Sequence, residues 1–159
     1  MKKILVPLAE GFEEIEAITI IDLLRRAGAE VVVASLEKRN VQGSHGLKVI
    51  ADTVLDEILD DNFEMIVLPG GVPGAPNLMG DARIIKLLKD QATANKTSAA
   101  ICAAPAVLEE AGLTIDKRIT SHPAWADRMT TAIHTGARVE TADLLITGQA
   151  AGSAMEFSF

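Results

Sequence analysis

The only cysteine of the chain, Cys102, is the first residue to consider for chemistry. It lies in the stretch SAAICAAPAV, at the end of an apolar run and just before Pro105. Proline suits the first turn of a helix, so the thiol would lie at a strand-to-helix turn, where helix amides and the helix dipole favour a thiolate. The glycines of the G-x-S-x-G nucleophile elbow are absent. Because a lone cysteine on an apolar strand is more often an inert core residue, both interpretations stay open.

Glu16 is the second residue of interest, because it falls on the apolar side of the helix expected over Glu13–Ala27. At about 100° per residue, Ile20 and Leu24 share its face. A carboxyl group on a buried face must be paired or protonated, since desolvation raises its pKa. Glu16 is therefore either a functional acid or a first-turn glutamate that the helix dipole stabilises and that still reaches water. Glu13 projects near the same face, so the periodicity does not single out Glu16.

Two further segments offer partners for the thiol. The stretch VLPGGVPGAPN follows a strand-like run, and its adjacent Gly70 and Gly71 would let a backbone N–H approach a reacting oxygen, as an oxyanion hole requires. The alternative is a plain turn. His122, before Pro123 in ITSHPAW, stands where a base would reach the thiol. A lone histidine before proline is more often a loop residue with a satisfied hydrogen bond.

Other kinds of chemistry find little support in the sequence. The three histidines are far apart, without HxxxH or HxH spacing, so we predict no metal site. No GK[ST] follows the glycine-rich stretch and the first turn lacks GxGxxG, so we expect no nucleotide and no other cofactor. A single cysteine forms no internal disulfide. The net charge of −7 argues against nucleic acid or an anionic membrane as a partner, which favours a small, neutral or weakly polar substrate.

The elements that must position these residues alternate between strand and helix. Apolar runs of strand length cover 4–8, 31–36, 65–68, 99–102 and 144–147, and helix-period segments cover 13–27, 82–94 and 105–111. Gly28 and Gly112 would close the first and last of these helices. The stretch 41–54 is expected to make a short β excursion before a helical LDEILDD segment.

Continuous apolar strands are typical of parallel sheets that are covered on both faces. We therefore predict an α/β fold of one domain over residues 1–159, a flavodoxin-like (Rossmann-like) sandwich with a mostly parallel sheet and helices on both faces. Its sites would lie at the carboxyl ends of the strands.

The surroundings of the protein are indicated by its first segments. Met1 leads directly into the strand-like KKILVPL, without the apolar region of a signal peptide or a stretch of about 18 apolar residues. We therefore expect a cytoplasmic protein.

Ile15 and Ile18 fall on the otherwise polar face of the first helix. They are either scattered surface apolar residues or a subunit contact.

Five segments in the expected order resemble the ThiJ/PfpI superfamily, and within it the DJ-one branch of deglycases and their bacterial relatives. They are EGFEEIEAITIIDLLRRAG, VLPGG, AAICAAPAVL, TSHP and ITGQAAGSAMEF. The resemblance implies that Cys102 is a reactive cysteine on a strained elbow and that protonated Glu16 donates a hydrogen bond to its thiolate. It also implies an oxyanion hole formed by the backbone N–H groups of Gly71 and Ala103. His122 matches a nearby histidine that is often not aligned as a triad member.

The resemblance further implies a homodimer that packs the first helix near its two-fold axis. Ile15, Ile18 and Arg26 then become interface residues, and His45 stands where close relatives have an interface arginine. Relatives continue AMEF into a long apolar helix over the sheet, whereas this chain stops at Phe159. We therefore expect that last helix to be missing, so that either the sequence is truncated or something else covers that face, since an uncovered apolar patch would invite association.

For function, the resemblance implies a cofactor-independent, cysteine-dependent enzyme of the glyoxalase III or protein deglycase type. It would convert methylglyoxal, or its early adducts with an amine or a thiol, to a hydroxy acid. A different class stays open, in which oxidation of Cys102 makes the protein a redox-sensing stress-response chaperone. A third alternative, a cysteine peptidase, needs a well-aligned Cys–His pair and usually a higher oligomer.

Overall fold

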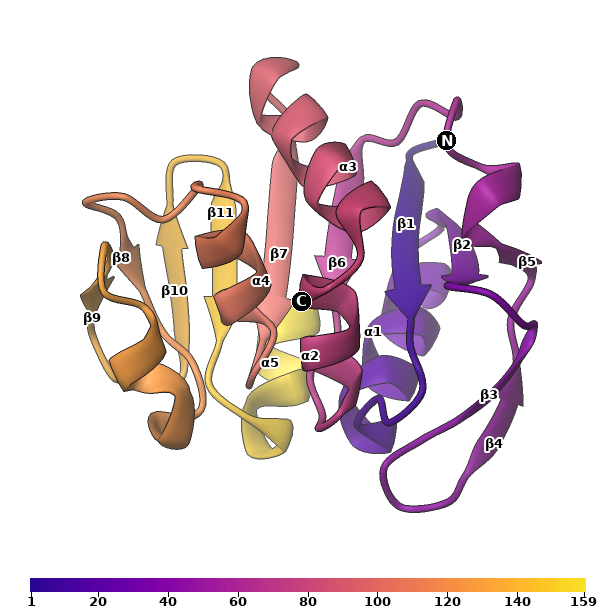
Figure 1. Cartoon of the computed structure of the whole chain (residues 1–159), viewed down its shortest axis with the longest axis horizontal. Helices are drawn as coiled ribbons and strands as arrows, with labels where there is room; N and C mark the ends of the chain where they lie inside the picture. Colours follow the sequence, from indigo (N-terminus) through magenta and orange to yellow (C-terminus); the bar gives the residue numbers. More distant parts are fainter.

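The apolar runs of the sequence pair to form a seven-stranded sheet in the order β10-β11-β7-β6-β1-β2-β5 (Figure 1). The computed structural model describes residues 1–159. All neighbours in the sheet are parallel except β10 and β11, which are antiparallel. The strands are β1 (Lys3–Leu8), β2 (Glu30–Ser35), β5 (Thr53–Val54), β6 (Met65–Leu68), β7 (Thr97–Ile101), β10 (Val139–Ala142) and β11 (Leu145–Gly148).

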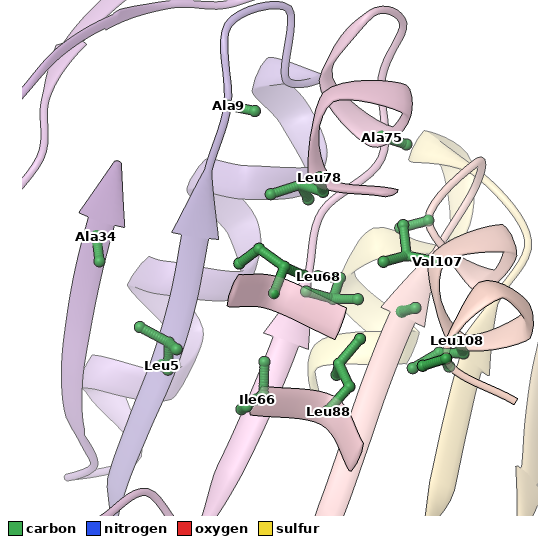
Figure 2. Close-up of a cluster of buried hydrophobic side chains, with 14 of the residues drawn as sticks. Leu5, Ala9, Ala34, Ile66, Leu68, Ala75, Leu78, Leu88, Val107 and Leu108 are labelled. Atoms are coloured by element: carbon green, nitrogen blue, oxygen red, sulfur yellow. The ribbon is translucent and has the colours of Figure 1, made fainter. Parts of the chain in front are cut away.

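Helices cover both faces of this sheet, which confirms the predicted α/β sandwich (Figure 1). One face carries α1 (Glu14–Arg26) and α5 (Ala154–Ser158). The other carries α2 (Gly74–Met79), α3 (Ala82–Thr93) and α4 (Pro105–Glu110). Each face has its own cluster of buried apolar side chains. Figure 2 shows one of them, in which Leu5 and Leu68 from the strands lie with Leu78, Leu88 and Val107 from the helices.

Local signals set the ends of α1. The helix begins after Glu13, whose carboxylate accepts a hydrogen bond from the N–H of Glu16 and so satisfies one free donor of the first turn. It ends before Gly28, which has a left-handed φ of +86°. Gly112 has a φ of +76° and plays the same part after α4. The prediction that Gly28 and Gly112 close these two helices is thus confirmed.

Short elements account for most of the differences from the sequence prediction. The stretch 41–54 contains the expected strands, because β3 (Asn40–Gln42) and β4 (Lys48–Ile50) form an antiparallel pair and β5 joins the sheet edge. The predicted helical LDEILDD holds only the 3-10 turn η1 (Leu55–Glu57), so that prediction was wrong in extent.

Other elements were not predicted at all. Helix α2 was missed because glycine and proline in GAPNLM both argue against a helix. The small strands β8 (Arg118–Ile119) and β9 (Ile133–His134) and the 3-10 turns η2 (Pro123–Arg128) and η3 (Ala151–Ser153) are too short to show a hydrophobic period.

An apolar groove of about 110 Å³ opens on the face that carries α1 and α5. Ile20 and Leu24 of α1, Phe157 of α5 and Phe159 contribute to its lining, and Phe159 is 92% exposed. This is an exposed apolar surface of the kind that the sequence leads us to expect. No helix of the fold is both long enough and apolar enough to cross a membrane.

Candidate functional site

Cys102 lies directly after β7, on a turn that strains its backbone. Its φ is +65°, a left-handed conformation that costs an ordinary side chain about 1–2 kcal/mol. Two hydrogen bonds hold the turn: the N–H of Cys102 donates to the carbonyl of Gly148 at 3.0 Å, and its carbonyl accepts from the N–H of His122 at 2.8 Å. Strain of this kind persists where the surroundings impose it, which occurs most often at functional sites.

Glu16 brings a buried acid to this turn. The residue is 0% exposed, so the first helix does place it on its buried face. Its Oε2 accepts a hydrogen bond from the N–H of Gly70 at 2.8 Å. Its Oε1 is buried and has no hydrogen-bond partner, and the carboxyl group lies near enough to the Cys102 side chain for each group to influence the pKa of the other. The acid and the thiol are therefore placed to exchange a proton.

The electrostatics of this pair differ from the sequence expectation. Burial raises the pKa of Glu16 to about 7. Burial, followed by the charge of Glu16, raises the pKa of the Cys102 thiol to about 12, whereas we expected helix amides to favour the thiolate. Helix α4 begins only at Pro105. The N–H groups of Ala103 and Gly71 do lower the thiol pKa, but burial and the neighbouring carboxylate outweigh them.

The Glu16 carboxyl group and the Cys102 thiol therefore titrate as a coupled pair, in which the charge of one changes the pKa of the other. A carboxylate beside the sulfur opposes the thiolate, because two like charges in a low-dielectric site repel each other. When the proton lies on Glu16, that repulsion disappears. The sulfur anion then faces the two backbone N–H groups of Gly71 and Ala103 that already lower its pKa. The protonated form of Glu16 is therefore the form that is compatible with a thiolate at Cys102.

A closed ring of three hydrogen bonds fixes the position of Glu16. The N–H of Glu13 donates to the carbonyl of Gly70 at 2.9 Å, and the N–H of Gly70 donates to Glu16 Oε2 at 2.8 Å. The N–H of Glu16 donates to Glu13 Oε2 at 2.7 Å. The two glutamates that the helical period left equivalent therefore differ, since Glu16 is buried beside the thiol and Glu13 caps the helix.

The glycine pair after β6 makes the close approach possible. A Cβ atom on Gly70 would lie 2.7 Å from the Cβ of Cys102 and 2.7 Å from Glu16 Oε2. A Cβ atom on Gly71, whose φ is +101°, would lie 2.3 Å from the N of Glu13. The sequence indicated this pair as a possible source of a backbone N–H. It did not indicate that Gly70 lies against both Glu16 and Cys102, so that any side chain there would collide with both.

His122 lies on the loop beside Cys102, but its ring is engaged elsewhere. Its Nδ1 accepts a hydrogen bond from the N–H of Ala124 at 3.1 Å, which caps the 3-10 turn η2. A ring nitrogen that accepts carries no proton, so the neutral ring holds its proton on Nε2. In this arrangement neither nitrogen is free to act as a base toward the thiol.

The residues expected at an interface lie on one exposed surface of α1 and its neighbouring hairpin. Ile15 is 58% exposed and Ile18 is 42% exposed. Arg26 pairs with Asp22 at 3.0 Å. His45 has a partner that the sequence did not reveal, because its Nδ1 lies 3.0 Å from Oε2 of Glu14, which is 31 positions away.

Three side chains near this surface could in principle bind a metal ion. Glu13, Glu14 and His45 each offer an atom within 4.8 Å of the others. The carboxylates already have other hydrogen-bond partners, since Glu13 caps α1 and Glu14 accepts from the backbone N–H groups of His45 and Leu47. The cluster is thus accounted for as the attachment of the β3–β4 hairpin to α1.

Comparison with known proteins finds relatives of similar sequence and structures of similar fold. The chain matches the model of the DJ-1/PfpI family over residues 2–159. It is 44% identical to "Protein DJ-1 homolog A" of Arabidopsis thaliana, over 98% of this chain and 40% of that protein. It is 34% identical to "Glutathione-independent glyoxalase DJR-1.2" of Caenorhabditis elegans, over 98% of this chain and 83% of that protein.

A solved structure agrees with these matches. The oxidized DJ-1 of Toxoplasma gondii superposes with a TM-score of 0.94 at 38% identity, covering 99% of this chain and 87% of that chain. The chain spans about two fifths of the length of the Arabidopsis thaliana relative. The family model, the relatives and the superposed structure together show that the chain belongs to the DJ-1/PfpI family.

Proposed function

We propose that the chain is a cofactor-independent enzyme that uses Cys102 to convert methylglyoxal, or its early adducts with amines and thiols, to a hydroxy acid. One observation carries the proposal: a buried acid, Glu16, and the N–H groups of Gly71 and Ala103 converge on one thiol at a strained turn. The glyoxalase name of the nematode relative supports the same class of reaction.

The first step is addition to the aldehyde. The Cys102 sulfur gives its proton to Glu16 and forms a bond to the aldehyde carbon, while the π electrons of the C=O bond move to oxygen. The N–H groups of Gly71 and Ala103 stabilise that oxygen anion. Protonated Glu16 then supplies the proton that converts the anion to a hemithioacetal.

The second step moves hydrogen between two carbons. Glu16, now a carboxylate, removes the proton from the former aldehyde carbon and returns it to the neighbouring ketone carbon through an enediol. In the same isomerisation the hydroxyl proton on the former aldehyde oxygen passes to the former ketone oxygen, so the first carbon becomes the thioester carbonyl and the second an alcohol. One carbon is oxidised and the other is reduced, so no external oxidant is needed. The product is a thioester of lactate, and water then breaks the C–S bond and restores the thiol.

The direct test is lactate formation from methylglyoxal by the Cys102→Ser variant. We expect the variant to lose turnover, because a serine hydroxyl beside a buried acid is a much weaker nucleophile than the thiolate. Thr130→Ala, at an exposed position, serves as the matched control and should keep turnover. Undiminished lactate formation by the serine variant would refute the proposal.

A second function is favoured by the oxidized state of the Toxoplasma gondii structure. In this alternative, peroxide oxidises Cys102: the sulfur attacks the O–O bond, an S–O bond forms and water leaves, and a second peroxide gives the sulfinate. Intact-mass measurement after mild peroxide would show the addition of two oxygen atoms. If that addition left suppression of protein aggregation unchanged, the sensor function would be wrong.

The peptidase alternative is not supported by the site, because Nδ1 of His122 is engaged by Ala124. For assembly we propose a homodimer that buries the exposed Ile15 and Ile18 of α1, with Arg26 and His45 at its edge. Replacement of Ile18 by Asp should convert the dimer to a monomer in sedimentation experiments. An unchanged sedimentation coefficient would place the contact elsewhere.

A further inference from the structure

The surroundings of the thiol depend on the orientation of one peptide unit, the bond between Cys102 and Ala103. This bond is trans, and a trans peptide is planar, so the Cys102 carbonyl and the Ala103 N–H point in opposite directions. The carbonyl accepts a hydrogen bond from the N–H of His122 at 2.8 Å, and the Ala103 N–H is one of the two that lower the thiol pKa. A group that fixes the His122 N–H therefore also aims the Ala103 N–H at the sulfur.

Ser121 fixes that donor. Its hydroxyl donates a hydrogen bond to the carbonyl of His122 at 2.9 Å, which closes a ring of atoms around the peptide bond between Ser121 and His122. The His122 N–H belongs to this same peptide bond, so the ring restricts its rotation. Ser121 is 0% exposed, and its hydroxyl is therefore out of reach of a substrate.

His134 holds the hydroxyl of Ser121 from a segment 13 positions further along the chain, with its Nε2 at 2.9 Å from Ser121 Oγ. A hydroxyl has one proton and a carbonyl oxygen only accepts, so with that proton on the His122 carbonyl the donor to Ser121 is Nε2 of His134. The pairing of β9 with β8, in which His134 lies opposite Ile119, brings the ring to this place beside the β10 edge of the sheet (Figure 1).

We propose that His134 is a positioning residue for the Cys102 turn and acts through Ser121 and the His122 N–H. His134 donates to Ser121, Ser121 fixes the peptide that carries the His122 N–H, and that N–H fixes the peptide that carries the Ala103 N–H. Neither His134 nor Ser121 needs to touch the thiol or a substrate. The inference rests on the proposed function only for its effect on lactate formation, because the reactivity of Cys102 is measurable without a substrate.

The rate of Cys102 alkylation by iodoacetamide, followed by intact mass over a range of pH, tests this role. Cys102 is the only cysteine, so the mass increase reports it alone. His134→Ala and Ser121→Ala should each shift the alkylation profile to higher pH and slow the reaction at neutral pH by about two- to tenfold, the factor that corresponds to one ordinary hydrogen bond. His134→Gln, which keeps a side-chain N–H, and Ser121→Thr should restore most of the rate. The double variant should react like Ser121→Ala alone, because the two residues act in series.

Thr135→Ala controls for a general loosening of this segment. It removes the hydrogen bond from Thr135 Oγ1 to Glu140 Oε2 at 2.9 Å, one residue beyond His134, and leaves Ser121 untouched. Its alkylation profile should match that of the wild type even where urea unfolding shows a comparable loss of stability.

The proposal is wrong if His134→Ala keeps the wild-type alkylation profile, if His134→Gln reacts no faster than His134→Ala, or if Thr135→Ala shifts the profile equally. Should His134→Ala fail to fold, Ser121→Ala and Ser121→Thr decide by the same comparison. Failure of the proposed function is recognised separately, since a wild-type protein that forms no lactate would refute that function and leave the alkylation rates as they are.

Discussion

The backbone N–H of Glu16 donates a hydrogen bond of 2.7 Å to the carboxylate of Glu13, so the helix cap and the buried acid are parts of one arrangement. The cap fixes the first turn of α1, and its charge is one of the causes that raise the pKa of Glu16. Glu13 does not need to touch a substrate to matter. It acts as a positioning residue for the acid beside Cys102.

Substitutions at Glu13 should separate its cap from its charge. Glu13→Gln keeps a side-chain acceptor but removes the charge, so the pKa of Glu16 should fall. Glu13→Ala also removes the cap, and should cost about 1 kcal/mol of unfolding free energy. The pH dependence of Cys102 alkylation reports the first effect and denaturant unfolding the second. An unchanged alkylation profile in both variants would contradict this role.

The pH dependence of stability should report Glu16. Its pKa is raised from 4.5 to about 7 on folding, so its stabilising contribution is complete below pH 4.5 and is lost as the pH rises through 7. The loss amounts to about 3 kcal/mol, from about 1.4 kcal/mol per pKa unit. Glu16→Gln should remove it, so the variant should gain relative stability between pH 4.5 and 7.5 in urea unfolding. A parallel pH profile for both proteins would contradict the raised pKa.

Gly70 should tolerate no side chain. Gly70→Ala would place a Cβ atom 2.7 Å from both Cys102 Cβ and Glu16 Oε2, and so force the thiol and the acid apart. We expect a loss of about 1–3 kcal/mol in stability and a loss of lactate formation. Gly152→Ala is the matched control, because a Cβ atom there meets nothing within 4 Å. Equal activity of the two variants would show that the spacing set by Gly70 is unimportant.

His122 provides a test of which group moves the proton. His122→Asn keeps a side-chain acceptor for the η2 turn, whereas His122→Ala removes it. If Glu16 carries the proton, the Asn variant should retain lactate formation near the wild-type rate. Comparable loss in both variants would instead assign the base to the imidazole.

The hydrophobic period and the glycines at helix ends were enough to predict the α/β class, five strands of the sheet and the main helices. They placed Glu16 on the apolar side of its helix, but they did not distinguish it from Glu13 or settle whether it is buried. The strands around Val6 and Val67 are continuous apolar runs, and Gly28 stands where α1 must end. The upward shift of the Cys102 thiol pKa could not be predicted from these sequence patterns. It depends on how deeply Cys102 and Glu16 are buried together, which only the three-dimensional packing decides.

Contacts between distant residues account for the other differences. His45 and Glu14 are 31 residues apart in the sequence, and no local sequence pattern indicates that their side chains are in contact. The ring nitrogen of His122 could have faced the thiol on sequence grounds, and only the conformation of the η2 turn shows that it binds Ala124 instead.

The central claim is that Glu16 carries the proton for Cys102, and kcat for lactate formation in Glu16→Gln tests it most directly. The amide keeps an oxygen for the N–H of Gly70 but cannot exchange a proton with the thiol. We predict a decrease of about 10²–10⁴-fold, the usual contribution of a general acid–base group, with Cys102 still open to alkylation. A kcat equal to that of the wild type would contradict the account.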